Sequence, residues 1–104
     1  MILVETRVFT REIARLLTDD EYRELQYKLI AHPNAGSVIR GSRGLRKLRW
    51  GTKRRGKRGG LRVIYFWDVP DQIFLLLPYD KRETEDLTKA QILKLRRVVE
   101  DGLK

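Results

Sequence analysis

The first part of the chain groups its apolar residues in two patterns. Residues 2–5 form a short apolar run, which predicts a strand. Apolar side chains then return at i, i+4, i+7 and i+8, a spacing that places them on one face of an α-helix. These residues are Phe9, Ile13, Leu16 and Leu17. We therefore expect a strand followed by an amphipathic helix that ends at Leu17.

A second helix is predicted to follow directly. Residues 18–21 read Thr-Asp-Asp-Glu, a capping box in which the threonine oxygen and the glutamate carboxylate satisfy free backbone amides at a helix start. The face expected to be buried consists of Tyr22, Leu25, Leu29 and Ile30, and Pro33, Asn34 and Gly36 are expected to close the helix. The single histidine, His32, lies at this end, where we expect a solvated or helix-capping imidazole.

The second half of the chain predicts a sheet and a final helix. Strand character is seen in residues 45–50, 61–68 and 72–78. Residues 73–77 are apolar throughout, as expected for a strand that is covered on both faces. The turn-forming residues 68–71 should make the last two strands antiparallel.

A second capping box predicts the C-terminal helix. Residues 88–91 read Thr-Lys-Ala-Gln, Ile92, Leu95 and Val99 follow at helical spacing, and Gly102 is the expected stop. The fold class predicted is α+β, with a small antiparallel β-sheet flanked by two N-terminal helices and a C-terminal helix. We expect one domain that spans residues 1–104.

Composition restricts the chemistry of a possible site. The 104 residues include no cysteine and one histidine, which argues against a disulfide framework, a thiolate zinc site and a cysteine nucleophile. We expect no metal site. No apolar run is long enough to span a bilayer, and the first residues lack the features of a signal peptide, so a cytoplasmic location is expected.

The net charge of +9 is concentrated in one part of the chain. Residues 40–62 hold nearly half of the 23 lysines and arginines and none of the 14 acids. A directional field of this kind attracts a polyanion, and the candidates are nucleic acid, an acidic membrane surface and an acidic protein. A surface that serves only solubility mixes both signs. We therefore favour phosphate binding, with an affinity that falls as salt rises.

Strand alternation predicts which cations share a surface. Lys47 and Arg49 should point to one face and Arg46 to the other. Arg62 begins the neighbouring strand, so strand pairing should bring it near Lys47 and Arg49. Further RNA contacts are expected from Arg46, from stacking on Tyr65, and from the cations of the glycine-rich hairpin loop, which are Lys53, Arg54, Arg55, Lys57 and Arg58.

The strings GLRKLR, GKRGG, LRVIYFW and LLLPYDKRETEDL follow one another in this order. Together they resemble the RelE superfamily of toxins from toxin–antitoxin pairs, and in particular its HigB-like branch. The resemblance covers nearly the whole chain and implies the RelE-like microbial ribonuclease fold. It also implies a metal-independent, cofactor-free endoribonuclease that enters the ribosomal A site and cuts mRNA during translation, which inhibits translation and arrests growth.

The same resemblance implies partners and site residues. The partners are mRNA, the ribosome with its rRNA, and a cognate antitoxin of the helix-turn-helix type, through which alone operator DNA would be contacted; no membrane is implied. The family's basic pair falls on Lys47 and Arg49, and the arginine that opens the next strand falls on Arg62. The basic residue after the last strand falls on Lys81 or Arg82.

Two positions depart from the family pattern. Asp80 stands where the family has a glycine, which adds an acid among the cations. A downstream tyrosine of some members is replaced here by Leu87 and Thr88, so Tyr79 or Tyr65 is a candidate substitute.

Cleavage of RNA through its own 2′-hydroxyl needs a base, positive charge on the phosphorane and an acid for the leaving 5′-oxygen. Lys47 is the candidate base, Arg62 and Arg82 are candidates for charge stabilisation, and Tyr79 or Lys81 is the candidate acid. A non-catalytic basic module that binds RNA or the ribosome is the alternative. A DNA-binding protein is disfavoured, because no predicted helix carries a dense basic face.

Overall fold

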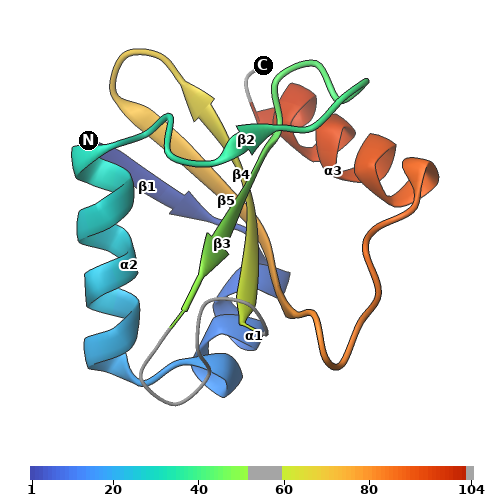
Figure 1. Cartoon of the computed structure of the whole chain (residues 1–104). Helices are drawn as coiled ribbons and strands as arrows, with labels where there is room; N and C mark the ends of the chain where they lie inside the picture. Colours follow the sequence, from blue (N-terminus) through green and yellow to red (C-terminus); the bar gives the residue numbers. More distant parts are fainter. Residues whose placement is uncertain (52–59, 103–104) are drawn as a thin grey trace.

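The computed structural model describes residues 1–51 and 60–102, which form a five-stranded sheet with helices on both faces (Figure 1). The strands are β1 (Ile2–Glu5), β2 (Ser37–Val38), β3 (Arg46–Trp50), β4 (Leu61–Asp68) and β5 (Gln72–Asp80). The helices are α1 (Arg7–Leu16), α2 (Asp19–Ala31) and α3 (Lys89–Gly102). The predicted α+β class, with two N-terminal helices and a C-terminal helix, is confirmed.

Local sequence determines where two of the helices start. At the start of α2, the Thr18 hydroxyl accepts a hydrogen bond from the Glu21 amide at 3.2 Å, and the Glu21 carboxylate accepts one from the Thr18 amide at 2.9 Å. Thr88 and Gln91 make the same reciprocal pair at the start of α3, at 3.2 and 2.8 Å. Both predicted capping boxes are therefore confirmed.

The sheet is mixed, which corrects the prediction of an antiparallel sheet. Its strand order is β1-β5-β4-β3-β2, and β2 to β5 pair antiparallel. The edge strand β1 instead runs parallel to β5. Between these two strands the chain forms α1, α2 and the other three strands, so the parallel pair is not joined by a tight turn, which parallel pairing does not allow. The edge strand β2 was not predicted, because its two residues carry no periodic pattern.

Each face of the sheet carries its own apolar cluster. Helices α1 and α2 bury residues such as Leu25 and Leu29 against one face, and α3 buries Ile92 against the other. Residues 73–77 of β5 contribute to both clusters, so the predicted cover on both faces is confirmed. Ile30 was expected to be buried but is 43% exposed. It follows Leu29 by one residue and therefore points about 100° away around the helix.

Among residues 1–51 and 60–102, no helix has both the length and the apolar character that crossing a membrane requires.

Candidate nucleic-acid interface

Three neighbouring strands place polar side chains in one row. In the register of the sheet, Arg49 of β3 lies opposite Arg62 of β4, and Arg62 lies opposite Tyr79 of β5. Lys47 precedes Arg49 by two residues, so its side chain leaves the strand on the same face. The sheet thus brings Lys47, Arg49 and Arg62 to one surface, as strand alternation predicted, and adds Tyr79 to them.

A β-bulge in β5 determines the direction of Tyr79. Consecutive residues of β4 pair with Leu77 and Leu75, so Leu76 is an extra residue in β5. The Thr6 hydroxyl donates a hydrogen bond to the Leu76 carbonyl at 2.9 Å, which satisfies an acceptor beside the interrupted ladder. Leu75 packs with the α1 and α2 side, whereas Leu77 and Tyr79 pack with the α3 side. If the same residues of β5 paired with β4 without a bulge, Tyr79 would lie opposite Leu61, on the face that α1 and α2 cover.

Arg62 is the most buried cation of the row, with 2% of its surface exposed. Its Nη1 donates a hydrogen bond to the Gly60 carbonyl at 3.2 Å. Within the described part of the chain, no carboxylate forms an ion pair with it. Arg49 is exposed and Lys47 is partly buried. A buried guanidinium beside two further cations gives this end of the sheet a strong positive potential.

Asp86, which sequence reasoning missed, lies at the centre of this arrangement. Its Oδ1 accepts a hydrogen bond from the Tyr79 hydroxyl at 3.3 Å and lies 3.7 Å from Nζ of Lys47. The three residues share the lining of a small cavity of ≈ 70 Å³, together with Ile64 and Leu87. The only sequence signal for Asp86 was its place in the polar run after β5, which is also typical of a solvated segment.

The protonation of Tyr79 and Asp86 reflects these contacts. Burial, supported by the Asp86 charge, raises the pKa of Tyr79 to about 12, so the phenol keeps its proton at neutral pH. The Lys47 charge is the main cause that lowers the pKa of Asp86, and Lys81, the Tyr79 hydrogen bond and Arg62 act in the same direction. Lys81 therefore belongs to this cluster.

Arg82 pairs with Asp80, away from the cluster around Asp86. Its Nη2 lies 3.1 Å from Oδ2 of Asp80, and its backbone amide also donates to that carboxylate. Asp80 is buried and lies opposite Leu61, on the face that packs against α1 and α2. Asp80, which departs from the pattern of the family that the sequence resembles, thus pairs with Arg82 away from the row of cations. Of the two candidates after β5, Lys81 is the one that acts on Asp86.

Two residues predicted to contact RNA, Tyr65 and Arg46, make hydrogen bonds to backbone groups of the fold. Tyr65 is fully buried; its hydroxyl donates to the Pro33 carbonyl at 2.7 Å and accepts from the Gly36 amide at 2.8 Å. Arg46 points to the opposite face from Lys47 and donates to the Gly36 carbonyl at 2.8 Å. Because these groups are engaged within the fold, neither belongs to the RNA surface that we propose. Five predicted loop cations, Lys53, Arg54, Arg55, Lys57 and Arg58, lie outside the described residues.

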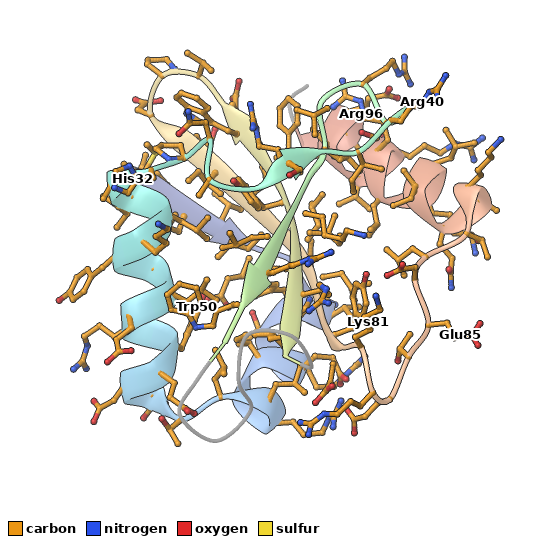
Figure 2. All side chains as sticks on the ribbon, viewed as in Figure 1. His32, Arg40, Trp50, Lys81, Glu85 and Arg96 are labelled. Carbon is orange, nitrogen blue, oxygen red and sulfur yellow. The ribbon has the colours of Figure 1, made fainter. Side chains whose placement is uncertain are left out.

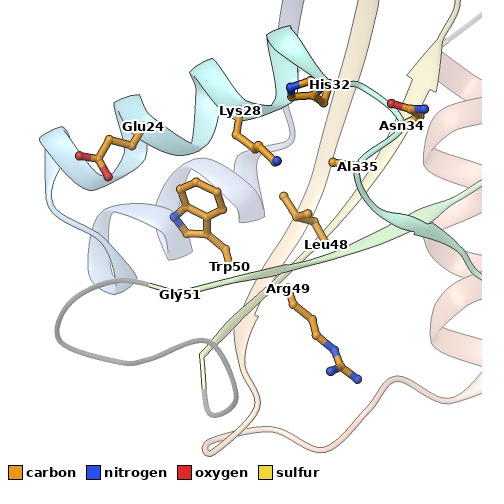
Figure 3. A pocket seen from close by; sticks show the side chains of 9 residues that line it. All are labelled: Glu24, Lys28, His32, Asn34, Ala35, Leu48, Arg49, Trp50 and Gly51. Carbon is orange, nitrogen blue, oxygen red and sulfur yellow. The ribbon is translucent and has the colours of Figure 1, made fainter.

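A broad, open depression of ≈ 970 Å³ lies between α2 and β3 (Figure 3). The Trp50 ring turns toward α2 inside it, whereas the Arg49 side chain points away across β3. His32 lines the same depression, is exposed and forms the C-terminal cap of α2, which confirms the position expected for it. In the part of the chain that is described, no three His, Cys, Asp or Glu side chains gather as a metal site.

No protein-family model matches the sequence. Among solved structures, the chain is similar to a free-state mutant of the E. coli toxin RelE, with a TM-score of 0.58 and 19% sequence identity. The likeness covers 81% of this chain and 86% of that chain. The chain has a RelE-like fold. At 19% identity the likeness shows the architecture, and it does not show an activity.

Proposed function

We propose that this chain is the toxin of a type II toxin–antitoxin pair, in the HigB-like branch of the RelE superfamily. Its activity is ribosome-dependent endoribonucleolytic cleavage of mRNA in the A site, which inhibits translation. The observation that supports this most is the row of Arg49, Arg62 and Tyr79, with Lys47 and Lys81 beside it, on one face of a RelE-like sheet. This is a compact set of phosphate-binding and proton-carrying groups.

The proposed reaction uses these groups without a metal or a cofactor. A base takes the proton of the 2′-hydroxyl, the 2′-oxygen attacks the neighbouring phosphorus, and the 5′-oxygen leaves with a proton from an acid. Arg62 and Arg49 stabilise the charge that develops on the phosphorane. The acid is Tyr79 or Lys81. The high pKa of Tyr79 supports this role, because the phenol is protonated when the leaving group needs the proton.

Lys47 is the proposed base, and it starts from an ion pair. Its Nζ lies 3.7 Å from Asp86, so it has to leave this pair and release its own proton to solvent before it takes a proton from RNA. The cations between residues 53 and 58, which lie outside the described residues, are proposed to bind the flanking RNA phosphates.

The proposed partners follow from the same charge distribution. Residues 25–67 contain no Asp or Glu, so this surface suits rRNA, mRNA and an acidic antitoxin segment that competes with them. We propose a helix-turn-helix antitoxin, operator DNA bound only through it, and a cytoplasmic location for a single-domain protein.

A purified translation system tests the function. Toxin is added to ribosomes stalled on a defined message, and new 5′ ends are mapped. We expect new ends within the A-site codon for the wild type. Because Arg62 is buried, the informative variant is Lys47→Ala with Arg49→Ala, for which we expect cleavage at least about a hundredfold slower.

The matched control is Arg23→Ala with Lys28→Ala. It removes the same two charges from exposed positions on α2 and should cleave normally. If the wild type binds ribosomes tightly yet produces no new ends, the chain is the alternative, a non-catalytic module that binds RNA or the ribosome. If the Lys47 and Arg49 variant cleaves like the control, the site assignment is wrong.

A further inference from the structure

One oxygen of Asp86 contacts two of the proposed catalytic groups. Oδ1 accepts from the Tyr79 hydroxyl at 3.3 Å and lies 3.7 Å from Nζ of Lys47. Arg62 and Lys81 act on the same carboxylate through their charges. Lys47 is the proposed base, Tyr79 and Lys81 are the candidate acids, and Arg62 is proposed to stabilise the phosphorane, so all four belong to the site proposed around the scissile phosphate. A carboxylate in this position presents an anionic oxygen where the mechanism requires a phosphate oxygen.

The place of Asp86 in the chain allows it to leave this position. It belongs to the irregular segment 81–88 between β5 and α3, and 54% of its side chain is exposed. The next residue, Leu87, packs against the α3 cluster and holds the segment to the sheet. Rotation of the Asp86 side chain therefore releases the carboxylate without opening the apolar core.

The Asp86 carboxylate and an RNA phosphate compete for the same cations. Two anions that share the same cationic groups repel each other, so RNA phosphate and the Asp86 carboxylate cannot both lie beside Lys47. The carboxylate is connected to the site by the chain itself, so it is always available as a competitor. Its pairing is weakened by its exposure, because water screens an ion pair at the surface.

We propose that Asp86 occupies the scissile-phosphate subsite of the free protein, as an internal anion that RNA must displace. This inference rests on the function proposed for the chain. The positive charge of the site is then partly offset when no substrate is bound. The consequence is a reduced affinity for isolated RNA, which leaves the ribosome to supply the additional binding energy that displaces the carboxylate.

The neighbouring acid provides a matched control. Glu85 is exposed, and Figure 2 shows its side chain directed outward, away from Lys81. Asp86→Asn and Glu85→Gln each remove one negative charge from adjacent positions, so they change the long-range field almost equally. Only Asp86→Asn removes the anion from the subsite.

The experiment measures binding of the purified protein to a short RNA that is 2′-O-methylated at every position and therefore cannot be cleaved. Fluorescence anisotropy at fixed salt gives the dissociation constant. We expect Asp86→Asn to bind about tenfold more tightly than the wild type, and Glu85→Gln to bind less than about twofold more tightly. Asp86→Ala should show the same gain, which guards against an effect specific to the introduced amide.

A double substitution identifies the origin of the gain. In a Lys47→Ala background, Asp86→Asn should improve binding no more than Glu85→Gln does, because the shared cation is absent. If Asp86→Asn binds RNA no better than Glu85→Gln in the otherwise wild-type chain, the internal-anion proposal is wrong. This outcome leaves the proposed function intact if the wild type still cleaves ribosome-bound message. The reverse pattern, a gain in binding without any cleavage by the wild type, would instead reject the function and keep the anion subsite.

Discussion

Replacing Tyr65 by phenylalanine tests whether this residue is structural. Its hydroxyl joins β4 to the segment after α2, with one hydrogen bond donated to the Pro33 carbonyl and one accepted from the Gly36 amide. Tyr65→Phe keeps the ring and removes the oxygen that makes both bonds. The expected result is a less stable protein whose RNA chemistry is otherwise unchanged.

The magnitude follows from what the missing oxygen leaves behind. The Gly36 amide is buried, and a buried donor without a partner costs about 1–3 kcal/mol. The Pro33 carbonyl is only partly buried, so water replaces much of its lost bond. We therefore expect the free energy of unfolding to fall by about 2 kcal/mol. For a domain of this size, the midpoint of thermal unfolding should fall by roughly 10 °C.

Urea unfolding followed by circular dichroism measures this difference. Tyr27→Phe is the matched control, because Tyr27 is 65% exposed and its hydroxyl makes no hydrogen bond to the described residues. The control should change stability by less than about 0.5 kcal/mol. A Tyr65→Phe protein as stable as this control would refute the assignment. Normal stability combined with weakened RNA binding would restore Tyr65 to the RNA surface.

Three further predictions concern the site and the fold. Tyr79→Phe should slow single-turnover cleavage by about 10²–10⁴-fold if the phenol is the general acid. Because the pKa of Tyr79 is about 12, loss of its proton should not reduce the wild-type cleavage rate between pH 7 and 10. A decline in that range that is assigned to Tyr79 would contradict the structure. The carboxyl of Asp86 should titrate below its ordinary value of 3.8, so its contribution to stability is complete above that value and is lost as pH falls through the lower folded pKa. Carboxyl NMR titration checks this, and Lys47→Met should return the pKa toward 3.8. Thr18→Ala should cost about 1 kcal/mol of unfolding free energy in urea, and an unchanged midpoint would mean that the Glu21 capping box contributes nothing.

Features determined by neighbouring residues were predictable from the sequence. The capping box at Thr18 and the helical spacing after it involve residues within one or two turns, and both predicted the start of α2. The alternation of Lys47 and Leu48 similarly predicted which side chains of β3 face the core. In each case the information lies within a few residues of the element it specifies.

Features that depend on distant parts of the chain were not predictable. Nothing in residues 2–5 specifies that β1 lies parallel to β5. Residues 73–77 are all apolar, so they show no alternation in which a bulge at Leu76 would appear as a break. The face on which Tyr79 lies was hidden for this reason. Asp86 looked like an ordinary solvated acid because its partners, Lys47 and Tyr79, belong to other elements.

The extra residue at Leu76 gives a criterion for sorting related sequences. The phenol reaches the cationic face because β5 has one residue more between Phe74 and Tyr79 than β4 has between Phe66 and Arg62, and the bulge accommodates it. A homologue of the same length that paired without the bulge would keep its tyrosine in an alignment but place it opposite the position of Leu61, beneath α1 and α2. A homologue that lacks the extra residue would pair regularly and keep its tyrosine opposite the arginine. The register of β5 against β4, as well as residue identity, therefore decides which relatives keep this phenol beside the cations.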